Sequence, residues 1–170
     1  PYTTMSGLLA QAPSVYSVSG ALHTSIHLTS AAHFIQPNEF LGNGTLELIT
    51  RSLNGTLPGP TLYLNPGDKL IVDFYNDLAA DPSQIHRHNE FSVPNESNLH
   101  FHGLHVSGEL PSDDVTMAIK PGGYYRYVTP LPKDHLPGTH YLHPHRHGLT
   151  ALQVGGGAAG VIIIQNTPNI

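Results

Sequence analysis

The 170-residue chain contains no cysteine. Disulfide bonds, thiolate metal ligands and cysteine nucleophiles are therefore excluded within it. The redox compartment stays open, because cysteine-free proteins occur in every compartment.

Basic residues and long apolar runs are also scarce. Lys and Arg number 7 against 12 Asp and Glu, giving a net charge of −5. So few cations do not form a phosphate-binding surface, and we expect no nucleic-acid partner. The longest apolar candidate, residues 155–164, has about half of the ~20 residues needed to cross a bilayer, so we expect no membrane span.

Glycine, proline and histidine are abundant instead. The 17 Gly and 15 Pro favour short strands joined by turns over long helices. The 13 His outnumber Lys and Arg together, which makes imidazole the most frequent candidate for chemistry in this chain.

Hydrophobic alternation predicts an all-β fold. Residues 45–51 alternate, and in residues 69–75 the side chains of Leu70, Val72 and Phe74 share one face. Turns are expected at Leu57-Pro58-Gly59-Pro60 and Asn65-Pro66-Gly67-Asp68. Further strands are expected at 98–106, 124–129, 138–143 and 160–165. The pattern predicts an antiparallel sandwich or barrel.

The organisation is that of a single domain over residues 1–170. Residues 1–40 carry weaker signals, with strand pieces at 15–18 and around Ile26 and Leu28, and form an N-terminal extension of uncertain structure. Residues 79–97 are polar and interrupted by proline, which predicts a long surface loop.

Two His-x-His pairs are the main candidates for function. His100 and His102 form the first pair, and His143 and His145 the second. Residues i and i+2 of a strand project from the same face about 7 Å apart. Because a metal–imidazole bond is only about 2.0–2.1 Å long, two neighbouring ions fit each pair better than one ion does. Two such strands facing each other would surround a small cluster with four imidazoles.

Imidazole suits copper, zinc, iron and nickel, and the pairs contain no carboxylate for calcium or magnesium. A lone His-x-His is usually a polar strand segment facing water. Two pairs on two expected strands, each beside glycine or proline, favour a metal site.

Short motifs recur in a fixed order along residues 53–164. They are residues 54–61 (NGTLPGPT), 65–68 (NPGD), 98–105 (NLHFHGLH), 120–123 (KPGG), 138–139 with 143–148 (GT, HPHRHG), 153–154 (QV) and 160–164 (GVIII). This ordered set resembles the first, cupredoxin-like domain of laccase-like multicopper oxidases, which implies a Greek-key cupredoxin fold.

The resemblance implies a half-site for a trinuclear copper cluster. His100 would be the type 2 copper ligand, and His102, His143 and His145 would be type 3 ligands. Family members reduce dioxygen to water with electrons from an organic or metal-ion substrate. His147 would have an outer-shell role.

The chain departs from a complete oxidase of this family. Four more cluster histidines and the cysteine of the type 1 copper come from a C-terminal cupredoxin domain in the family, and nothing here matches those motifs. We therefore expect no type 1 copper in this chain, no turnover by the isolated chain, and a C-terminal cupredoxin domain or another chain as the partner that completes the cluster.

A second hypothesis is a secreted structural or assembly protein, forming a homo-oligomer or larger assembly, that binds metal without catalysis. A Cu,Zn superoxide dismutase-like sandwich also uses His-x-His, but the flanking motifs match the oxidases and no disulfide can form. Ser107 and Asp113-Asp114 lack the context of a hydrolase nucleophile.

The remaining histidines are assigned lesser roles. His86 and His88 lie in the polar loop, His105 and His140 alternate off the faces of the two pairs, and His23, His27, His33 and His135 are expected at the surface or as caps.

Sequons occur at Asn43, Asn54 and Asn95, as candidate glycosylation sites or as turn residues. The chain starts at Pro1 without a signal peptide, as a mature secreted protein, a processed fragment or a trimmed chain would. We expect a secreted or periplasmic location and a glycoprotein.

Overall fold

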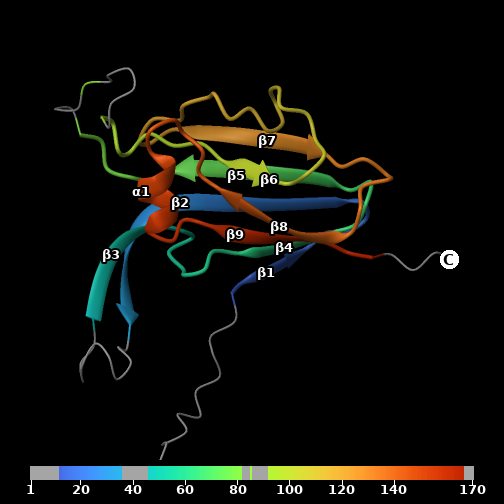
Figure 1. Ribbon diagram of the computed structural model, residues 1–170, viewed down its shortest axis with the longest axis horizontal. Coiled ribbons are helices and arrows are strands. Elements are labelled where there is room, and N and C mark those ends of the chain that lie inside the picture. The colour runs from blue at the N-terminus through green and yellow to red at the C-terminus, as the bar shows by residue number, and fades with distance from the viewer. Residues whose placement is uncertain (1–11, 36–45, 82–84, 86–91, 167–170) are drawn as a thin grey trace, which may run out of the picture.

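The computed structural model describes residues 12–35, 46–81, 85 and 92–166, which form two packed β-sheets (Figure 1). The first sheet has the strand order β1 (Ser14–Tyr16), β4 (Thr61–Leu64), β9 (Gly160–Ile164), β8 (Gly138–His143), β6 (His100–His102). The second has the order β3 (Leu46–Leu53), β2 (Ala21–Ile35), β5 (Lys69–Asn76), β7 (Tyr124–Pro130). One helix, α1 (Thr150–Gly155), precedes β9.

The strands pair in both directions. β1 with β4, β4 with β9 and β2 with β5 are parallel, whereas the other pairs are antiparallel. The all-β sandwich is confirmed, but its sheets are mixed rather than purely antiparallel. Each parallel pair joins segments distant in sequence, and alternation alone carries no information on pairing direction.

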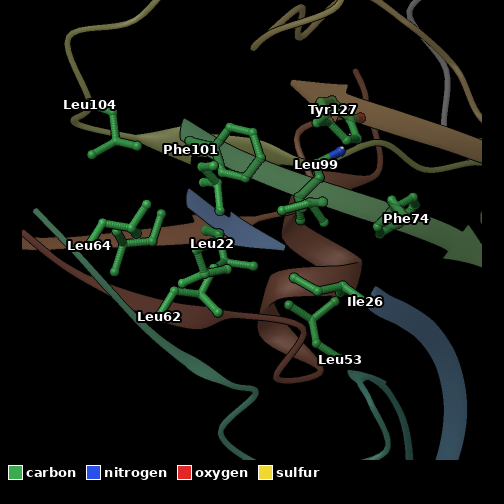
Figure 2. Packing of buried hydrophobic residues seen from close by; sticks show 14 of the residues in the cluster. Leu22, Ile26, Leu53, Leu62, Leu64, Phe74, Leu99, Phe101, Leu104 and Tyr127 are labelled. Atoms are coloured by element: carbon green, nitrogen blue, oxygen red, sulfur yellow. Dashed lines mark hydrogen bonds between the residues drawn. The ribbon is translucent and has the colours of Figure 1, made fainter. Parts of the chain in front are cut away.

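The inner faces of the two sheets form the hydrophobic core. Leu70, Val72 and Phe74 are fully buried, as their alternation predicts. Figure 2 shows Phe74 and Tyr127 of the second sheet in the same cluster as Phe101 of β6. The ring centres of Phe101 and Tyr127 are 5.6 Å apart in an edge-to-face contact. Phe101, between His100 and His102, thus anchors β6 in the core.

The turn that precedes β5 forms at the expected Asn-Pro-Gly-Asp segment. Gly67 has a positive φ of 87°, a conformation that glycine adopts without steric cost. The carboxylate of Asp68 accepts the backbone N–H of Asn65 at 2.7 Å, which closes the turn.

Helix α1 fixes the segment that leads into β6. The amide of Gln153 is fully buried. It donates to the carbonyls of Pro94 (3.1 Å) and Glu96 (2.8 Å) and accepts the Ser97 hydroxyl (2.9 Å). α1 is too short to span a membrane, and no other helix occurs in the described residues.

Several expected elements differ in extent. The expected strand at 98–106 contracts to His100–His102, because the chain turns at Gly103, where φ is 87°. The weak pieces around Ile26 and Leu28 belong to one 15-residue strand, β2. β4 and α1 were not expected.

Among the tyrosines of β7, Tyr127 is fully buried, whereas Tyr124 is 49% exposed.

Candidate metal centre

Strands β6 and β8 lie side by side and bring the two histidine pairs together. His100 stands directly opposite His143 in the antiparallel register, and His102 opposite Tyr141. The intervening Phe101 and Leu142 are fully buried in the core. The four cross-strand partners therefore project from the outer face of one sheet. The pairs are thus neighbours within a sheet, not on strands that face each other.

His145 lies two residues beyond the end of β8 and is held by a buried asparagine. The Oδ1 atom of Asn98 accepts the backbone N–H of His145 at 2.7 Å. The Nδ2 atom of Asn98 donates to the carbonyls of Val115 (2.8 Å) and Met117 (3.2 Å). These bonds fix the chain after β8, where His145 lies 5.0 Å from His100 between ring centres.

The four imidazoles form a compact cluster. Centre-to-centre distances are 5.4 Å for His100–His102, 5.3 Å for His100–His143, 5.6 Å for His102–His143 and 5.7 Å for His143–His145. Donor nitrogens of His100, His102 and His143 lie within 4.8 Å of one another. Two imidazoles that share one ion at the usual bond length have ring centres about 5 Å apart. The spacing and the all-imidazole donor set fit copper or zinc.

Hydrogen bonds outside the cluster orient two of the rings. His100 Nδ1 donates to Asp113 Oδ2 at 2.8 Å, and Asp113 Oδ1 accepts the backbone N–H of Phe101 at 2.9 Å. His143 Nδ1 donates to the Pro144 carbonyl at 2.9 Å. Both contacts leave Nε2 as the atom with the available lone pair, an arrangement typical of metal-binding histidines.

Burial also favours the neutral form of His143. Its side chain is buried, and desolvation lowers its pKa below the ordinary histidine value. The hydrogen bond to Pro144 opposes this shift, and the neighbouring His100, His145 and His102 reinforce it. His143 is therefore neutral at pH 7, as a metal ligand must be.

Three residues at this site were not expected from the sequence. Asp113 and Asn98 reach the histidines through long-range contacts that have no fixed spacing. Tyr141 stacks on both His102 (4.4 Å between ring centres) and His143 (4.8 Å). Tyr141 lies two residues before His143 and therefore on the same face of the strand. Of these three residues, Tyr141 alone could have been predicted from strand alternation.

The other histidines occupy varied settings. His147 is exposed, and its outer-shell role stays a prediction. His23 pairs with Asp73 (2.7 Å) and His27 with Asp77 (2.6 Å), at the surface as expected. The surface assignment of His135 is wrong, because its side chain packs between His105 and His140 and it is only 4% exposed. His86 and His88 lie outside the described residues.

The two described sequons differ in accessibility, and Asn43 lies outside the described residues. Asn54 is exposed at a turn with a φ of 55°. Asn95 is half-buried: its Oδ1 accepts Arg51 Nη2 at 2.6 Å and its Nδ2 donates to the Ala79 carbonyl at 2.8 Å. The Ser97 of that second sequon is fully buried.

Comparison with known proteins identifies the family. The sequence profile of the multicopper oxidases matches residues 39–95 and 83–169. The chain belongs to the multicopper oxidase family.

Individual relatives have low sequence identity to this chain, and they are multicopper oxidases as well. The chain is 30% identical over 118 residues to a multicopper oxidase of Staphylococcus haemolyticus, covering 69% of this chain and 22% of that protein. It is 27% identical over 158 residues to an iron transport multicopper oxidase of Epichloe festucae, covering 88% of this chain and 22% of that protein. The chain therefore spans only about a fifth of the length of these relatives.

Solved structures support the same fold. A laccase-like multicopper oxidase of Ochrobactrum superposes with a TM-score of 0.68 at 22% identity, over 94% of this chain and 30% of that one. A Campylobacter jejuni multicopper oxidase, described as a metallo-oxidase, gives 0.67 at 22% identity over the same shares. These likenesses show the cupredoxin fold expected from the sequence.

Proposed function

We propose that this chain supplies half of the histidine ligands of a trinuclear copper site for dioxygen reduction. His100 would hold the type 2 copper, and His102, His143 and His145 the type 3 pair. The observation that carries the proposal is the convergence of four imidazoles at the ends of β6 and β8, with neighbouring ring centres 5.0–5.7 Å apart. Bound copper would supply the redox chemistry that passes electrons to dioxygen.

The surrounding residues act by orientation. Asp113 holds the His100 ring and the backbone of β6 at once. Asn98 sets the position of His145, and Phe101 anchors β6 in the core. Together they hold the rings near their binding positions before metal arrives, which limits the ordering cost of coordination.

The half-site requires a partner. The chain has no cysteine for a type 1 copper and spans about a fifth of its relatives. His102 and His145 are exposed, whereas His143 is buried. The cluster is therefore accessible at the sheet surface, where a second, cysteine-containing cupredoxin domain or another chain would add the remaining ligands.

Copper titration by calorimetry at neutral pH tests the proposal. We expect weak binding by the chain, lost in the His100→Ala/His143→Ala variant. A matched His23→Ala/His27→Ala variant, on the outer face of the other sheet, should bind as the parent does. Equal copper binding by all three proteins would contradict the assignment, provided that circular dichroism shows each to be folded.

A further inference from the structure

Strand β2 continues beyond the part of the second sheet that it shares with β5. Its residues 21–28 pair with β5, whereas in the described part of the chain residues 29–35 pair with β3 alone. This two-stranded ribbon, here called the arm, comprises residues 29–35 and 46–52 and extends away from the packed sheets (Figure 1). Side chains on the arm are therefore open to contacts from outside the sandwich.

One face of the arm is apolar and exposed to solvent. Leu28 of β2 is fully buried in the core, and Phe34, an even number of residues further along, continues on the same side of the strand. Ile49 shares this face, because it pairs with Ala32. Phe34 is nevertheless 70% exposed and Ile49 73% exposed. Apolar side chains exposed together on an element often mark a contact surface.

The two ends of this face carry opposite charges. Glu47, Ile49 and Arg51 occupy alternate positions of β3 and therefore lie on the same side. Glu47 is exposed and pairs with no cation in the described part of the chain. Arg51 donates from Nε and Nη2 to the neutral amide oxygen of Asn95, at 3.2 and 2.6 Å. The face is thus acidic at one end, apolar at its centre and basic at the other end.

The basic end of the face also adjoins a hollow of about 180 Å³. Ser30 and Arg51 of the arm line it, together with Leu78 and Ala79, which follow β5. Ser30 pairs with Arg51, and Phe34 lies four residues further along β2, at the acidic end. The same face therefore carries an exposed aromatic side chain at one end and a hollow at the other.

We propose that two copies of this chain associate face to face through this side of the arm. The two-fold axis lies in the interface, perpendicular to the strands, and passes between the two Ile49 side chains. Glu47 then faces Arg51 of the second copy, and Phe34 lies over the hollow of the second copy. A two-fold axis parallel to the strands would place Glu47 against Glu47, which the repulsion of like charges disfavours.

The interface is small. The 8 residues of β3 span roughly 26 Å, and two paired strands are about 10 Å wide. This area is well below the ~800 Å² per partner of a standard protein interface. We therefore expect a weak dimer that dissociates on dilution and weakens as salt screens the two Glu47–Arg51 pairs.

Sedimentation velocity of the 170-residue chain, in the presence of a chelator, tests the association without metal. We expect the dimer fraction to rise with protein concentration. Ile49→Ser removes the central apolar contact and should weaken the dimer about 10-fold or more. Val18→Ser is the matched control, because Val18 is also 73% exposed but lies outside the arm. It should leave the association unchanged.

Charge reversal tests the orientation of the two copies. Glu47→Arg and Arg51→Glu each place like charges opposite one another, so each variant alone should dimerise several-fold more weakly than the parent. An equimolar mixture of the two variants restores opposite charges at both ends and should associate more tightly than either variant. Circular dichroism verifies that each variant is folded.

Three results would overturn the proposal. They are a folded chain that stays monomeric at every concentration, equal effects of Ile49→Ser and Val18→Ser, and a mixture of the charge variants that associates no better than its components. Because the chelator removes metal and the arm carries no residue of the four-histidine cluster, these results are independent of the function proposed above.

Discussion

Asp113 connects the first histidine pair to the strand that carries it. The two carboxylate oxygens of Asp113 accept hydrogen bonds from His100 Nδ1 and from the Phe101 N–H, and replacing it with Asn leaves a single amide oxygen that can accept. We expect Asp113→Asn to lower copper affinity about 10- to 100-fold while the fold persists. Competition with a chelator of known affinity measures the change.

The adjacent Asp114 provides the control. Its carboxylate accepts the backbone N–H and hydroxyl of Thr116 (2.8 and 2.6 Å) and does not contact the cluster in the described residues. Asp114→Asn should leave copper affinity unchanged. Equal losses in the two variants would show that Asp113 does not act through His100.

Glycosylation should distinguish the two described sequons. Asn54 is exposed at a turn, where its Oδ1 accepts the backbone N–H of His27 at 2.8 Å and its Nδ2 lies 3.5 Å from the Ser25 carbonyl. The Asn95 amide is held at both ends by Arg51 and Ala79. In a host that glycosylates secreted proteins, we expect a glycan on Asn54 and none on Asn95 of the folded product. Peptide mass spectrometry reads both positions, and a fully occupied Asn95 would contradict the structure.

The sequence indicated that His100 and His102 share one face of a strand, because that spacing is local, whereas His145 lies beyond the end of β8. Alternation fixes which neighbours of His100 and His143 share a face, whatever the rest of the fold does. The sequence could not place Asn98, Asp113 or His135, because their contacts depend on segments brought together by folding. Asn98 and His145, for example, are 47 residues apart.

Strands β2, β5 and β7 are linked on their outer face by Asp73. Its side chain is 8% exposed and accepts Arg126 Nε (2.7 Å), Arg126 Nη2 (2.9 Å) and Tyr124 OH (2.6 Å), with His23 at 2.7 Å. The hydrogen bonds from Arg126 and then Tyr124 hold the pKa of Asp73 well below its usual range. The charged form is therefore stabilised in the folded state.

Because the pKa of Asp73 is lower in the folded than in the unfolded chain, its charged form stabilises the fold at any pH above the unfolded-state pKa, near 3.9. This stabilisation is lost as the pH falls from there toward the folded-state pKa. We expect Asp73→Asn to lower the free energy of unfolding at pH 7 by about 1–3 kcal/mol. The difference in free energy of unfolding between the Asp73→Asn variant and the parent should become smaller below about pH 4. Urea unfolding across this range measures it, with the exposed Asp134→Asn as control. If that difference stayed constant down to pH 2, the stabilising role of the charged Asp73 would be contradicted.

The strands found from sequence are those with clear alternation and bounding turns. Residues 69–75 and 138–143 correspond closely to β5 and β8. β2 was fragmented because His23, His27 and His33 interrupt its apolar pattern, although they lie on its polar outer side. α1 was missed because a six-residue helix is too short for a periodic signal.

The isolated chain should not oxidise phenolic substrates. Dioxygen reduction to water needs four electrons delivered to the cluster, and the chain has no cysteine for the copper that collects them. It also supplies only half of the ligands, and misplacement by ~1 Å can cost about a hundredfold in rate. Oxygen uptake by the copper-loaded chain should be at background and should rise when a cysteine-containing cupredoxin domain is added.

Sustained turnover by the chain alone would show that electrons enter by another path. Copper binding without turnover, even with the partner domain added, would support a structural or binding role instead. The oxygen-uptake experiment therefore distinguishes an oxidase domain from a structural or binding protein.

Anomalous scattering at the copper edge, from crystals of the chain grown with excess copper, tests the half-site most directly. We expect density beside Nε2 of His100 and separate density among His102, His143 and His145. Copper bound elsewhere in the crystal, with no density at these four histidines, would contradict it.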